Sequence, residues 1–199
     1  MMKSDMDTQL NYEQSQQLLA NKFYKDHFNS DTTRYDWGDD YGRSMQRRDI
    51  DCSISINGEQ VNISEKFRRE DWGDIWIELY SSYPNTLGWA LTGRGVDYLT
   101  YFTKKKYTNE NQVYVVKHCI IEKFAQQMYK FFTDNVDIYN ELKTKNRVNK
   151  VVEVDGKLMN VWFTKSVSTR TINGKTSEWT SYGACIKWSD IKDYELYKI

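Results

Sequence analysis

Two acidic residues and a lysine on alternating positions are the strongest candidates for chemistry in this chain. Asp51, Lys66 and Glu78 lie in three consecutive segments between residues 48 and 80, and each segment alternates apolar and polar residues as a half-buried strand does. If the apolar faces share one core, the three charged side chains can project together from neighbouring strands. Carboxylates hold a hard cation such as Mg²⁺ or Mn²⁺, and a lysine can orient water and offset developing phosphate charge. The pattern therefore suggests a metal-dependent site for phosphodiester hydrolysis.

The same charges have a simpler explanation. Charged residues on the solvent face of a hairpin are ordinary, because most surface positions of a soluble protein are polar. The alternative is a structural protein whose charged strand faces are only solvated.

A short basic and aromatic segment follows the lysine. Arg68, Arg69 and Trp72 lie between the second and third expected strands, and Arg47 precedes the first. Cations contact phosphate groups and an indole ring stacks on a base, so these four residues are the candidates for binding nucleic acid. The alternative interpretation is an exposed loop whose cations pair with the acids beside them.

The elements that must position these residues form a mixed pattern of helices and strands. Apolar residues at helical spacing predict helices over 11–28, 118–132 and about 133–142. Alternation and turn dipeptides predict further strands over 97–103, 112–117, 151–154, 157–169 and 175–187. Residues 29–43 are expected as a loop, and residues 189–194 as a short helical turn.

At 199 residues the chain is expected to form a single domain, 1–199, with a core at about 10–142. A β-rich extension, a meander or hairpin, is expected at about 147–199. This extension combines tryptophan and tyrosine residues with four cations, Lys165, Arg170, Lys175 and Lys187. Such an aromatic and basic sheet can stack bases, dock a protein partner or complete the core.

Composition excludes several classes. The 28 basic and 28 acidic residues cancel, which argues against a polyanion binder held by global charge but permits a local basic groove. No apolar run is long enough to span a bilayer, and the polar start is unlike a signal peptide. The three cysteines are widely spaced, without the spacing of a zinc site or a disulfide framework. A soluble, cytoplasmic protein without membrane association is expected.

Two stretches carry a resemblance to a known family. QRRDIDCSISINGEQVNISEKFRREDWGDIWIELYS and the following GWALTGRGVDYLTYF are similar to small phage and bacterial members of the PD-(D/E)XK nuclease superfamily, which has the restriction-endonuclease-like fold. The order of elements resembles the family too, with a helix, a strand bearing an acid, a hairpin to a strand with lysine, further strands and a long helix. The match covers Gln46 to about Phe102, roughly a third of the chain.

The resemblance implies an α/β fold with a central mixed sheet flanked by helices, and a site that uses Mg²⁺ or Mn²⁺. Asp51 matches the metal-binding acid and Lys66 the motif lysine. Ser64 stands where the motif has a carboxylate. The missing ligand would come from Glu78 on the next strand, or from Glu65 if a bulge turned it inward.

The leading prediction is therefore a metal-dependent nuclease acting on DNA, with Arg68 and Arg69 on the scissile strand. The alternative is a nuclease-fold binding protein without catalysis, such as a phage-type inhibitor or adaptor that docks through the C-terminal aromatic sheet. Ser64 and the neutral net charge favour this alternative.

Overall fold

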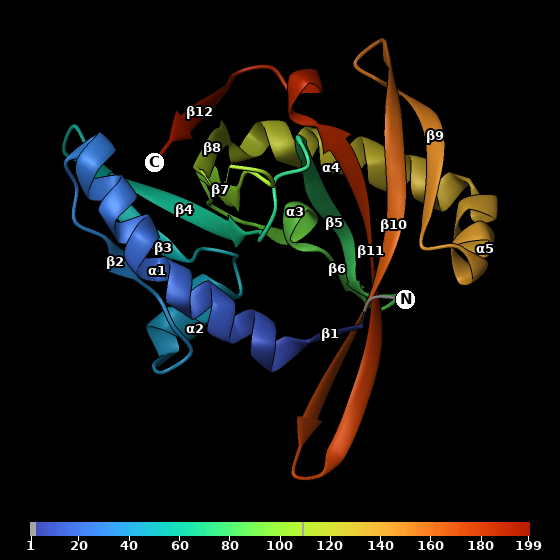
Figure 1. Cartoon of the computed structure of the whole chain (residues 1–199), viewed down its shortest axis with the longest axis horizontal. Coiled ribbons are helices and arrows are strands. Elements are labelled where there is room, and N and C mark those ends of the chain that lie inside the picture. Colours follow the sequence, from blue (N-terminus) through green and yellow to red (C-terminus); the bar gives the residue numbers. More distant parts are fainter. Residues whose placement is uncertain (1–2, 109) are drawn as a thin grey trace. The chain divides into compact units, whose positions relative to one another are not determined.

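The computed structural model describes residues 3–108 and 110–199 (Figure 1). The chain gathers into two compact units. Unit 1 comprises Met1–Tyr12, Gly73–Leu91 and Glu122–Ile191, and unit 2 comprises Glu13–Trp72, Thr92–Ile121 and Lys192–Ile199. Each unit combines a mixed β-sheet with helices, so the predicted α/β class is confirmed. The restriction-endonuclease-like fold and the single domain stay predictions.

The sheet of unit 2 carries the hairpin that was singled out in the sequence. Its strands, in the described part of the chain, are β2 (Thr33–Arg34), β3 (Cys52–Ile56), β4 (Glu59–Phe67), β7 (Tyr98–Lys104), β8 (Asn111–Lys117) and β12 (Tyr194–Lys198). Their order is β12-β8-β7-β4-β3-β2, with β4 and β7 parallel and the other neighbours antiparallel. Asn57 and Gly58 join β3 to β4 with φ values of 54° and 84°, as a tight hairpin turn requires. The predicted β3–β4 hairpin is confirmed.

Helix α1 (Met6–Phe28) begins in unit 1 and continues into unit 2, where it covers one face of this sheet. The contact is a single apolar cluster of buried residues, Ala20, Phe23, Tyr24, Cys52, Ile54, Ile63, Phe102 and Val113. Phe23 and Tyr24 meet the ring of Phe102 edge to face, with ring centroids 5.7 and 6.3 Å apart. Burial of this cluster fixes the helix against β3, β4, β7 and β8.

Residues 29–43 are more ordered than the loop that was predicted. Strand β2 pairs with β3, and helix α2 (Asp40–Gln46) begins after Asp39, whose side chain accepts a hydrogen bond from Gly42 N at 2.6 Å. A Cβ on Gly42 would lie 2.2 Å from the carbonyl oxygen of Asp36, so only glycine lets the helix approach this loop. Asp39 is therefore the N-cap of α2.

The sheet of unit 1 has six strands among the described residues: β1 (Lys3–Asp5), β5 (Asp74–Ser82), β6 (Thr86–Leu87), β9 (Arg147–Val154), β10 (Lys157–Ile172) and β11 (Lys175–Lys187). The order is β1-β10-β11-β5-β6, with β9 also pairing with β10; β1 and β10 are parallel. The turns at Asp155-Gly156 and Asn173-Gly174 have positive φ at both residues. Of the predicted meander or hairpin, the meander of three strands is confirmed, and the C-terminal extension stays a prediction.

Strand β5 was expected beside β4, and this prediction is wrong. Its neighbours are β11 and β6, both in the sheet of unit 1. The buried residues Ile75, Ile77 and Leu79 do alternate as predicted. Alternation identifies which face of a strand is buried but not which strand lies beside it, so the short sequence separation from β4 was misleading.

The remaining helices are short except for α4. They are α3 (Trp89–Thr92), α4 (His118–Asp134), α5 (Val136–Thr144) and a 3₁₀ turn, η1 (Trp188–Asp190). Phe131 and Phe132 of α4 pack on Phe163 of β10, with ring centroids 5.9 and 5.8 Å apart. These two aromatic residues of α4 therefore pack in the core of unit 1.

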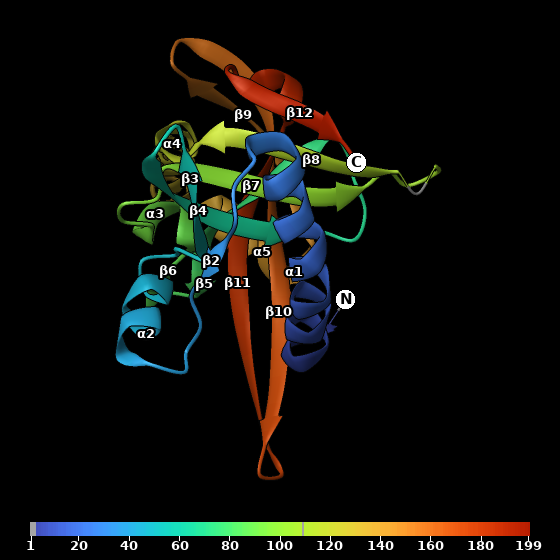
Figure 2. The same cartoon turned by 90° about the vertical axis from the view of Figure 1, so that its left-hand side faces the viewer.

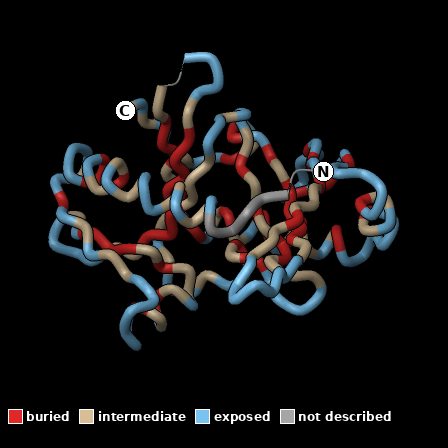
Figure 3. Tube along the Cα trace, turned by 60° about the horizontal axis from the view of Figure 1, so that its bottom comes forward, coloured by how far each residue is buried: buried red, intermediate tan, exposed pale blue. Residues whose placement is uncertain are grey.

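Burial follows the strands of each unit, while exposed residues follow the turns (Figure 3). No helix in residues 3–108 and 110–199 is both long and apolar enough to cross a bilayer.

Candidate active site

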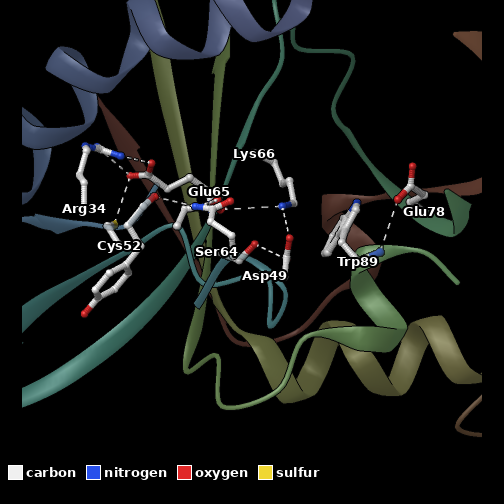
Figure 4. A network of polar contacts seen from close by, with 11 residues as sticks. Arg34, Asp49, Cys52, Ser64, Glu65, Lys66, Glu78 and Trp89 are labelled. Carbon is white, nitrogen blue, oxygen red and sulfur yellow. Dashed lines mark hydrogen bonds and ion pairs between the residues drawn. The ribbon is translucent and has the colours of Figure 1, made fainter. Parts of the chain in front are cut away.

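The candidate site lies in unit 2, at the point where helix α2 passes into strand β3. After α2 the chain turns sharply, because Asp49 N donates to the carbonyl of Gln46 and Ile50 N to that of Met45, each at 3.0 Å. Asp49 takes the left-handed conformation with φ 60°, which aspartate tolerates better than most residues. The turn directs the Asp49 carboxylate toward strand β4 (Figure 4).

Asp49 binds two side chains of β4. Its Oδ1 accepts a hydrogen bond from Lys66 Nζ at 2.9 Å, and its Oδ2 accepts one from Ser64 Oγ at 2.6 Å. Ser64 is fully buried. Ser64 thus serves as a donor that orients an acid from a different segment.

Asp51 completes the group. Its Oδ2 accepts a hydrogen bond from Glu65 N at 2.7 Å and lies 3.9 Å from Lys66 Nζ. Its backbone N–H donates to the carbonyl of Ile63 at 2.9 Å, so the residue is held at the end of β3 opposite β4. The side chains of Asp49, Lys66 and Asp51 are 18%, 23% and 26% exposed. All three remain open to a ligand from solvent.

The charges of this group perturb one another. Burial alone would lower the pKa of Lys66, but the charges of Asp49 and Asp51 outweigh burial and raise it, so the lysine is a cation at neutral pH. Burial raises the pKa of Asp51 to about 7; the charge of Lys66 opposes this rise, and the charges of Asp49 and Glu65 add to it. Lys66 is one cation beside the two carboxylates of Asp49 and Asp51, so the site favours a further positive charge.

Glu65 points away from this group. Its carboxylate accepts hydrogen bonds from both terminal nitrogens of Arg34, at 2.7 and 3.3 Å, and from the thiol of Cys52 at 3.5 Å. Successive residues of a regular strand face opposite sides, and β4 keeps its register with both neighbours. The structure therefore does not bring Glu65 to Asp51 and Lys66, and the bulge that would turn it inward is absent from the described β4 pairing.

Glu78 lies on β5 in unit 1, in the other sheet. Its Oε2 accepts a hydrogen bond from the backbone N–H of Trp89 at 3.4 Å (Figure 4). Its predicted role as a metal ligand stays a prediction.

A divalent cation such as Mg²⁺ requires several oxygen ligands. Within residues 3–108 and 110–199 no group of three or more His, Cys, Asp or Glu side chains could hold a metal. Mg²⁺, however, is commonly bound through one or two carboxylates together with water and substrate phosphate. Asp49 and Asp51 fit that requirement by the chemistry of their oxygens. Asp49 was not among the predicted site residues, although its position two residues before Asp51 places both on one face of an alternating segment and was a signal for it.

The predicted nucleic-acid-binding residues lie in unit 2. Arg47 and Arg69 are exposed, and Arg68 is half-buried beyond the end of β4. Trp72 is 56% exposed, and Lys106 Nζ lies 4.0 Å from the centroid of its ring. The loop after β4 and the β7–β8 turn thus place a lysine on the tryptophan, a contact that the sequence did not predict.

No family model, curated protein or solved structure matches this chain. The resemblance to the PD-(D/E)XK superfamily therefore stays a prediction from the sequence.

Proposed function

We propose that this protein is a metal-dependent nuclease that hydrolyses phosphodiester bonds of DNA, with Asp49, Asp51 and Lys66 as its catalytic group. The observation that supports this proposal most strongly is the convergence of two carboxylates and a half-buried, charged lysine on one side of the β3–β4 hairpin.

Each residue of the group has a distinct role. Asp49 and Asp51 would hold Mg²⁺ or Mn²⁺, which supplies Lewis-acid stabilisation of phosphate oxygens when bound. Lys66 is held by Asp49 at 2.9 Å and, as a fixed cation, orients the attacking water and offsets charge developing on the phosphate. Ser64 is a positioning residue, since its hydroxyl donates to the Asp49 carboxylate.

The surroundings of the hairpin suit a nucleic acid. Arg68 and Arg69 follow Lys66 by two and three residues, and Trp72 offers an exposed ring beside Lys106. Cations contact the phosphate backbone, and an aromatic ring packs on a base or sugar. We propose DNA and not RNA as the substrate because of the family resemblance. The cytoplasm is proposed as the location because of the composition.

The proposal is tested by calorimetric titration with MgCl₂ and by cleavage of plasmid and single-stranded DNA. Wild type is expected to bind Mg²⁺ and cut, and Asp51→Asn is expected to cut on the order of 100-fold more slowly or worse. Glu59→Gln is the matched control, because Glu59 is an exposed acid on the same hairpin. The absence of cutting by wild type with either Mg²⁺ or Mn²⁺ would overturn the proposal, and so would equal cutting by Asp51→Asn.

A second candidate is a binding protein that lacks catalysis. The pairing of Glu65 with Arg34 favours it, because this pairing commits the Glu65 carboxylate to an arginine instead of to a metal beside Asp51 and Lys66. Tight DNA or protein binding by wild type together with no cleavage would support this candidate.

A further inference from the structure

The β10–β11 hairpin of unit 1 continues as a two-stranded ribbon past the strands that flank it. Strand β9 pairs with β10 only as far as Thr164, β1 only as far as Thr169, and β5 pairs with β11 only from Tyr182 onward. Among the described residues no third strand pairs with residues 170–178, and residues 171–178 are all exposed. Figure 2 shows this ribbon, orange and red, reaching beyond the rest of the sheet.

One face of the ribbon carries cations, hydroxyls and an aromatic ring. The register pairs Arg170 with Ser177, Ile172 with Lys175, and Ser168 with Trp179. Residues directly opposite in an antiparallel pair share a face, and so do residues two apart on one strand. Arg170, Lys175 and Trp179 therefore share one face of the ribbon.

This face borders a hollow of about 830 Å³. Ser81 and Ser82, at the end of β5, form its other side, and Glu178 is the one acid that lines it in the described part of the chain. The hollow thus combines two cations, three serine hydroxyls and an indole ring. A protein interface core is depleted of lysine and glutamate, whereas Lys175 and Glu178 both line this hollow beside the ring.

This combination matches the chemistry of a nucleic acid strand. Arginine, lysine and serine side chains contact phosphate oxygens, and tryptophan stacks on a base whatever its sequence. A duplex keeps its base faces stacked inside, so only an unpaired strand offers a base to Trp179. We propose that this face of the ribbon binds single-stranded nucleic acid, with Arg170 and Lys175 on phosphates and Trp179 on a base.

The binding does not require cleavage, so it is tested separately from the nuclease activity. Fluorescence anisotropy with a labelled oligo(dT) and with a duplex of the same length, both in EDTA, measures affinity without hydrolysis. Wild type is expected to prefer the single strand. Arg170→Ala/Lys175→Ala is expected to weaken binding by tenfold or more. The fall of log K with log salt is expected to become less steep by about 1.4, since each cation contributes about 0.7.

Trp179→Leu is expected to weaken binding on the order of tenfold and to remove part of the tryptophan quenching by oligo(dT). Lys187→Ala is the control, because Lys187 is an exposed lysine at the other end of the same strand. Since Trp179 and Arg170 are both half-buried, the single variant Lys175→Ala, at an exposed position of the ribbon, keeps the test valid if the other variants unfold.

Three results would overturn the inference: no binding of oligo(dT) by wild type, equal binding by the double variant, or tighter binding of the duplex. A protein that binds oligo(dT) through this face but does not cut would refute the nuclease proposal and leave this inference standing.

Discussion

Removal of the Arg34 side chain would leave a buried carboxylate without its partner. Glu65 is 2% exposed at its side chain, and Arg34, which is 20% exposed, holds it through two hydrogen bonds. Breaking a buried ion pair on one side costs about 3–5 kcal/mol, and the partial exposure of Arg34 places the expected loss near the lower end, about 3 kcal/mol. For a chain of this size that loss corresponds to a fall in the melting temperature of about 6–12 °C.

The assay is urea denaturation of Arg34→Met followed by circular dichroism. Lys25→Ala is the control, because Lys25 and Asp31 form an exposed pair at 3.0 Å that is expected to contribute less than about 1 kcal/mol. The double variant Arg34→Met/Glu65→Met should recover much of the loss, since it removes the buried charge as well. A loss below about 1 kcal/mol in Arg34→Met would refute the argument that Glu65 is committed to this ion pair.

Three further perturbations test other parts of the structure. Gly42→Ala should destabilise the fold by about 1–3 kcal/mol in urea, because the new Cβ would overlap a backbone oxygen at 2.2 Å; an unchanged midpoint would contradict this. Ser64→Ala should lower the free energy of unfolding by about 1–3 kcal/mol and weaken Mg²⁺ binding in calorimetry, since Asp49 loses the hydroxyl that donates to it at 2.6 Å. An unchanged Mg²⁺ affinity would refute the positioning role of Ser64. Hydrogen bonds from Lys150 and Lys145 lower the pKa of Glu141 to about 2. The ionised Glu141 therefore contributes to folding stability above pH 4.5, and this contribution is lost as the pH falls toward 2. NMR titration should show the low pKa in wild type and a higher one in Lys150→Ala, and an ordinary value in wild type would contradict the assignment.

The features that the sequence predicted are local ones. The three turns at Asn57-Gly58, Asp155-Gly156 and Asn173-Gly174 need two residues with positive φ, and that requirement is visible in the dipeptide itself. Long helices such as α4 and long strands such as β10 carry enough periodic residues to be recognised.

The features that the sequence did not predict depend on distant partners or on short segments. Strand β5 was placed beside β4 because they are close in sequence, but its partner β11 lies about a hundred residues further along the chain. Strands β1 and β6 have three and two residues, too few for alternation to be read.

In the candidate site too, local features were predicted from the sequence and contacts between distant segments were not. The opposite orientations of Glu65 and Lys66 follow from strand geometry and were predicted, whereas the Arg34 partner of Glu65 comes from an edge strand 31 residues earlier. Asp49 was overlooked because its role depends on a left-handed turn after α2, a helix that the sequence did not reveal.

The measurement that tests the central claim most directly is DNA cleavage by Asp49→Asn and Glu65→Gln, compared with wild type under the same Mg²⁺ concentration and at a temperature where all three are folded. The account predicts that Asp49→Asn loses cleavage on the order of 100-fold, while Glu65→Gln stays near the wild-type rate because its side chain faces Arg34. Full activity in Asp49→Asn together with an inactive Glu65→Gln would show that the site is built from the other face of β4.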